Sequence, residues 1–121
     1  MNLLRADPDP SDPARVQIEA TRTADRLRSL SPARLRTPLA DGAPRALRAL
    51  ELAQQLADAA ADLAGRSRHR LPDVPDLAVG DVLAVCAADL VEGLRATADP
   101  VTVAPVATWA STRLTELRRL L

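Results

Sequence analysis

Apolar residues recur at spacings of three and four in four separate segments of the chain, and this rhythm restricts its fold more than any other feature. A repeat close to 3.6 residues places such positions on one side of an α-helix. The segment 43–65 shows it best, because Ala and Leu occupy nearly every position outside a narrow polar stripe of Arg48, Glu51, Gln55, Asp58 and Asp62. An apolar face this wide contacts more than one neighbour, so we predict a central helix here.

Three further segments predict amphipathic helices. In residues 13–30 the apolar stripe consists of Val16, Ala20, Thr23, Leu27 and Leu30. We expect the opposite, charged stripe to face solvent, and it contains Arg15, Glu19, Arg22 and Arg26. Residues 77–97 carry a seam of Val79, Leu83, Cys86, Leu90 and Leu94. A last helix is predicted to begin near 102–104, with Pro105 in its first turn, and to reach residue 120.

Capping residues, prolines and glycines mark where these helices begin and end. Asp12 precedes a proline and fits the start of the first helix, and residues 31–35 predict a single further turn. Gly65 suits the end of the central helix, and Asp76 is expected to cap the third one. The only β-like run, residues 101–103, lies between two prolines, so we predict no strand.

The pattern therefore predicts an all-α fold. Four amphipathic helices, joined by connectors of roughly four to twelve residues, favour an up-down four-helix bundle with antiparallel neighbours. The alternative is a three-helix bundle with a loosely attached N-terminal helix. Asp-Pro occurs three times in residues 1–13. We expect residues 1–12 to form a flexible leader and residues 13–121 to form one domain.

Composition narrows the possible functions. All sixteen basic residues are Arg and are balanced by sixteen acidic residues, so net charge favours neither nucleic acid nor an anionic membrane. No stretch reaches the roughly 18 to 20 apolar residues of a membrane-spanning helix. Residues 1–5 lack the apolar core of a secretory signal, so we expect a cytoplasmic protein. With no Phe or Tyr, the predicted core of Ala, Leu and Val requires closely approaching helices.

The sequence gives little support to catalytic or metal-dependent chemistry. One histidine and four glutamates are too few for the Glu-x-x-His pairs of di-metal bundles, so we expect no metal and no cofactor. Cys86 lies within an apolar seam and is expected to be an inert thiol rather than a nucleophile paired with His69. On a helical wheel Asp89 lies near that seam, so we predict that its carboxylate is partly buried and paired with an arginine. An enzyme with an arginine-lined pocket near Asp89 is therefore kept as one alternative.

The densest positive cluster lies between the second and third long helices and consists of Arg66, Arg68, His69 and Arg70. Such a cluster could bind a phosphate, a nucleic acid or an acidic partner, although cations are also common after a helix C-terminus. Because no aromatic residues alternate with these arginines, nucleic acid is the weaker interpretation. Anion binding through this loop is kept as the second hypothesis.

Trp109 is the only aromatic residue, and it lies off the predicted apolar seam of its helix. Tryptophan is enriched at the centres of protein interfaces. We therefore predict that this protein acts by association, as a homodimer or with another protein, and is not an enzyme. The expected contact surface consists of Trp109, Arg113, Leu120 and Leu121.

Overall fold

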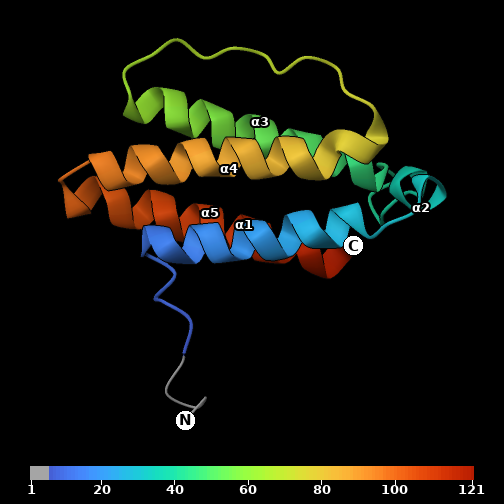
Figure 1. Cartoon of the computed structure of the whole chain (residues 1–121), viewed down its shortest axis with the longest axis horizontal. Coiled ribbons are helices and arrows are strands. Elements are labelled where there is room, and N and C mark those ends of the chain that lie inside the picture. The colour runs from blue at the N-terminus through green and yellow to red at the C-terminus, as the bar shows by residue number, and fades with distance from the viewer. Residues whose placement is uncertain (1–5) are drawn as a thin grey trace.

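The structure is a computed structural model that describes residues 6–121, and in that range every regular element is helical (Figure 1). The all-α prediction is therefore confirmed. The elements are α1 (Pro13–Arg28), α2 (Pro32–Arg36), α3 (Arg45–Leu63), the 3₁₀ turn η2 (Asp76–Ala78), α4 (Val79–Ala96) and α5 (Pro100–Leu120). No helix among these residues is long and apolar enough to cross a membrane.

Several helix ends follow directly from the sequence. The Asp12 carboxylate accepts a hydrogen bond from the backbone N–H of Ala14 at 2.8 Å, and Ser31 caps α2 in the same way. Gly65 has φ +64°, which lets the N–H of Arg66 bond the carbonyl of Ala61 at 2.9 Å and close α3.

The predicted first residues of two helices are wrong. Asp76 begins η2 and does not cap α4, whose N-cap residue is Ala78. α5 begins at Pro100, because the Asp99 carboxylate accepts from the N–H of Val101 at 3.0 Å and nucleates the helix there. Pro105 consequently lies inside α5 rather than in its first turn.

The directions of the long helices are fixed by residues that meet between them. Gly80, near the start of α4, lies against Leu27 at the end of α1, and Gly93, near the end of α4, lies against Leu63 at the end of α3. α4 therefore runs antiparallel to α1 and parallel to α3. α5 runs parallel to α1, since Thr115 bonds Glu19 and the last residue of the chain bonds Arg26.

Four long helices do pack side by side, but the expected alternation of directions does not hold. The connection after α3 does not turn tightly. It runs back along the whole of α3 and begins α4 at the opposite end (Figure 1). Twelve extended residues reach up to about 40 Å, more than the roughly 28 Å length of a 19-residue helix. The connector is thus long enough to make α3 and α4 parallel.

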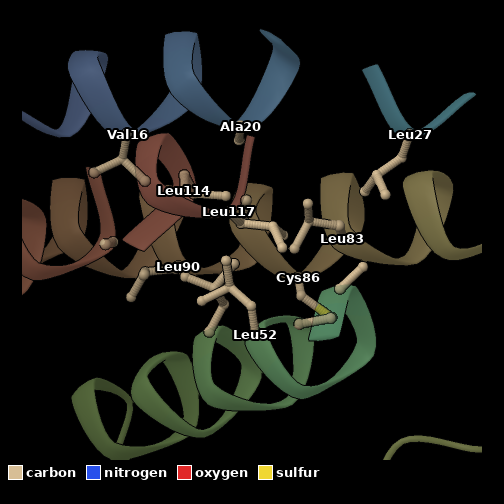
Figure 2. Close-up of a cluster of buried hydrophobic side chains, with 14 of the residues drawn as sticks. Val16, Ala20, Leu27, Leu52, Leu83, Cys86, Leu90, Leu114 and Leu117 are labelled. Atoms are coloured by element: carbon tan, nitrogen blue, oxygen red, sulfur yellow. The ribbon is translucent and has the colours of Figure 1, made fainter. Parts of the chain in front are cut away.

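The core lies where α1, α3, α4 and α5 meet, and leucines from all four helices interdigitate there (Figure 2). Fully buried alanines separate these leucines, among them Ala20, Ala49, Ala53, Ala87, Ala107 and Ala110. Small side chains let the helix backbones approach closely, which compensates for the absence of Phe and Tyr. α1 contributes Val16, Ala20 and Leu27 to this core, so the alternative with a loosely attached first helix is wrong.

The described part of the leader lies against the helices. The Asp7 carboxylate pairs with Arg22 at 2.9 Å, and the Pro8 carbonyl accepts a hydrogen bond from Arg15 at 2.8 Å. Residues 1–5 lie outside the described residues, and the flexibility of the leader stays a prediction.

Candidate functional site

The seam between α3 and α5 is the most open of the four seams between neighbouring long helices. α5 packs chiefly against α1 and touches α3 along few residues, which leaves two hollows on this side. One, of about 270 Å³, is lined by Gln55, Asp58, Ala59, Asp62, Arg68 and Trp109. The other, of about 100 Å³, is lined by Arg48, Glu51, Leu52, Arg113, Glu116, Leu117 and Leu120. We call the surface made by these two sets of residues the α3–α5 face.

Three of the four predicted interface residues lie on this face. Trp109 is half-buried against the core, Arg113 is exposed, and Leu120 is 54% exposed although it is a large apolar side chain. Leu121 is a correction, because only 6% of its surface is exposed. The end of α5 lies beside α1, where the backbone oxygen of Leu121 accepts a hydrogen bond from Arg26 at 2.9 Å.

Charges on the α3 side of this face are neutralised locally. The Arg68 guanidinium donates two hydrogen bonds to Asp62, at 2.7 and 3.0 Å, and thereby holds the pKa of that carboxyl below its ordinary value. Arg48 donates to Asp41 at 2.7 Å and also to Glu51. On α5, by contrast, Arg113 and Glu116 are 3.9 Å apart, too far for a hydrogen bond.

The structure brings three of the four residues of the basic segment together and separates the fourth. Arg68, His69 and Arg70 line a groove of about 430 Å³ between α3 and the long connector, where Arg68 is paired with Asp62. Arg66 lines a different hollow, between the ends of α3 and α4. Gln54 fixes that connector, because its side chain donates to the carbonyl of His69 and accepts from the N–H of Leu71.

Asp89 is exposed, so its predicted partial burial is wrong. The helical wheel placed it beside the apolar seam, but α3 and α1 cover neighbouring parts of α4 and leave this strip open. A hollow of about 430 Å³ does lie beside it, lined by Arg66, Asp89 and Glu92 together with small residues. One arginine against two carboxylates is not the arginine-lined pocket that the enzyme alternative required.

Cys86 is buried, which raises the pKa of its thiol to about 11, with a smaller contribution from the negative charge of Asp89. A thiol with so high a pKa carries almost no thiolate at neutral pH and is a poor nucleophile. Among the residues described, no cluster of three or more His, Cys, Asp and Glu side chains could hold a metal ion.

Glu19 departs from the sequence pattern in the opposite sense to Asp89. The charged stripe of α1 predicts that Glu19 faces solvent, yet it is 1% exposed between α1 and α5. Arg118 donates to both of its carboxylate oxygens at 3.1 and 3.2 Å, Arg22 donates at 2.9 Å, and the Thr115 hydroxyl donates at 3.0 Å. Burial by itself raises the pKa of Glu19, but these hydrogen bonds outweigh it and the net pKa lies below the ordinary value.

One signal in the sequence could have indicated this burial. Glu19 lies next to Ala20 and one turn from Val16 and Thr23, so apolar-stripe positions flank it on both sides.

The chain matches no family model, no curated protein and no solved structure.

Proposed function

We propose that this protein works by self-association, as a two-fold symmetric homodimer joined through the α3–α5 face. The observation that carries the proposal is the arrangement of four residues on α5. Trp109, Arg113, Glu116 and Leu120 follow one another at spacings of four, three and four, which places them on one stripe of the helix.

This stripe is complementary to itself when reversed. If two copies of α5 lie antiparallel about a two-fold axis between residues 114 and 115, Trp109 meets Leu120 of the second copy, and Arg113 meets its Glu116. A two-fold interface requires such reciprocal pairing. If residue i of one copy contacts residue j of the other, then residue j of the first copy contacts residue i of the second. The 3.9 Å separation of Arg113 and Glu116 within one chain leaves both charges available to the second copy.

Burial of the stripe also has a favourable energetic basis. Trp109 and Leu120 lie eleven residues apart, about 16 Å along the helix axis, so each copy offers two apolar anchors separated by a charged pair. Aromatic anchors that become buried contribute a large share of the binding free energy of an interface. Locally neutralised charges on α3 remove general repulsion between the two copies.

The mass of the protein in solution tests the proposal. We expect analytical ultracentrifugation at roughly 50 μM, a concentration suited to micromolar affinity, to show a species of twice the 12.9 kDa chain mass. Leu120→Arg should give a monomer. Val85→Arg is the matched control, because Val85 is also exposed, at 61%, but lies on α4 away from the face. A monomeric wild type, or equal loss of dimer in both variants, would refute the proposal.

Charge exchange provides a sharper test of the pairing. Arg113→Glu places two acidic side chains against each other in the dimer, and Glu116→Arg places two arginines together, so each single variant should dissociate. The double exchange restores an opposite-charge pair at both symmetric positions and should restore the dimer. Failure of the double variant to recover association would refute this register even if the protein is dimeric.

The proposal includes no catalytic step and no cofactor. It keeps the cytoplasm as the compartment, where the free thiol of Cys86 remains reduced.

A further inference from the structure

A further hollow, of about 230 Å³, lies beside the stripe described above. It is bounded by the leader, the first turn of α1 and the C-terminal half of α5. Its lining residues are Pro10, Arg15, Ser111, Thr112, Thr115, Glu116 and Arg119. The volume is several times the roughly 30 Å³ that one water molecule occupies in the liquid. The hollow can therefore hold a small polyatomic ligand.

Positive charge is in excess around this hollow. The carboxylate of Glu19 is already saturated by Arg118, Arg22 and Thr115. Arg15 uses Nη1 to donate to the Pro8 carbonyl, while its Nε is buried, 3.9 Å from Glu19, and has no hydrogen-bond partner.

Arg119 is exposed and forms no ion pair within residues 6–121. Glu116 supplies the one carboxylate among the lining residues. Asp9 lies nearby, and the pKa of its carboxyl is lowered chiefly by hydrogen bonds from Ser11 and to a smaller extent by the positive charge of Arg15. The lining itself therefore carries two guanidinium groups against a single carboxylate.

Hydroxyl groups complete the polar lining. The Thr115 hydroxyl is engaged by Glu19 and by the Ser111 carbonyl, whereas Thr112 is exposed and its hydroxyl has no hydrogen-bond partner within the described chain. Two guanidinium groups and a free hydroxyl match the several acceptor oxygens of a phosphate group better than the two oxygens of a carboxylate.

From this arrangement we infer that the hollow binds a small phosphate-bearing ligand, with Arg15, Arg119 and Thr112 as the recognising residues. The three recognising residues lie outside the stripe of Trp109, Arg113, Glu116 and Leu120, although Glu116 belongs both to that stripe and to the lining of the hollow.

Inorganic phosphate is the probe for the first test. We expect isothermal titration calorimetry of the intact chain to show saturable binding with a Kd on the order of 1 mM or below, tighter than for acetate. Arg119→Gln should weaken it at least ~10-fold, as loss of a charge-assisted contact does. Arg70→Gln removes the same charge from a distant exposed position and should change the Kd less than about 2-fold. Equal effects of the two substitutions would overturn the inference, as would equal affinities for phosphate and acetate.

Thr112→Val distinguishes a specific phosphate site from general attraction of phosphate to positive charge. This substitution removes the hydroxyl without changing charge or much volume at an exposed position, so the fold is retained and phosphate should bind several-fold more weakly. In ¹⁵N-resolved spectra of the wild type, phosphate should shift the amide signals of residues 111–119 more than those of residues 66–70. Unchanged affinity in Thr112→Val, or larger shifts in residues 66–70, would overturn the assignment.

Discussion

Replacing each of the two glycines of α4 by alanine tests how closely its helices pack. Both residues are helical, so alanine at either one removes the conformational freedom of glycine in the unfolded chain. At Gly80 an added Cβ would lie 3.0 Å from the backbone oxygen of Ala24 and 3.0 Å from Cγ of Arg28. At Gly93 it would lie 3.6 Å from Leu63, an ordinary van der Waals separation.

These distances predict that the same substitution changes the free energy of unfolding in opposite directions at the two sites. Gly→Ala in a helix interior is favourable by about 1 kcal/mol, and Gly93→Ala should gain most of this. Gly80 lies in the first turn of α4, where the gain is smaller. Its new methyl group must push the rigid backbone of α1 away by a few tenths of an ångström, and such overpacking costs about 1–3 kcal/mol. We expect Gly80→Ala to lower the free energy of unfolding by about 1–2 kcal/mol.

Urea unfolding followed by circular dichroism measures both changes. At a urea m-value of about 1–3 kcal/mol/M, the two midpoints should move in opposite directions by several tenths of a molar or more. All proteins should be compared at one concentration, because association would add its own contribution to stability. A Gly80→Ala protein as stable as Gly93→Ala would show that α1 and α4 are not in the close contact described, and would refute this reasoning.

Three further substitutions or measurements follow from buried or strained groups. Glu19→Gln should lower the free energy of unfolding by about 1–3 kcal/mol at pH 7, against at most about 0.5 for the exposed Glu51→Gln, both measured by urea unfolding. Since the folded-state pKa of Glu19 is below its ordinary 4.5, its contribution is complete above pH 4.5 and should disappear as pH falls further. Pro105→Ala supplies an N–H that can bond the carbonyl of Val101, so it should raise the free energy of unfolding by about 1 kcal/mol or more in the same assay. An unchanged free energy of unfolding would contradict the helical geometry around residue 105. The Cys86 thiol, with its pKa raised to about 11, should react with a thiol reagent at pH 8 only as fast as the protein unfolds, and rapid labelling of folded protein would contradict its burial.

Only part of the candidate surface could be predicted from the sequence. Trp109 stood out as a lone aromatic residue off its apolar seam, and the structure places it with Arg113 and Leu120 on one face. The same reasoning wrongly adds Leu121 to this surface, because a helical wheel does not show that α1 extends as far as the end of α5. The hollow around Arg15 and Arg119 joins α1 to α5, which no local pattern brings together.

Periodicity, caps and breakers are local properties, and they were enough to identify the helices and the short turn at residues 32–36. The direction of α4 depended on whether the twelve-residue connector between Leu63 and Asp76 turned back at once or crossed the molecule, and its length permits either. Burial of Glu19 likewise depended on α5 lying beside α1, because a wheel gives the angle of a side chain but not the width of surface that neighbouring helices cover. The sequence by itself therefore determined where the chain is helical, and only long-range packing decided which polar groups those helices enclose.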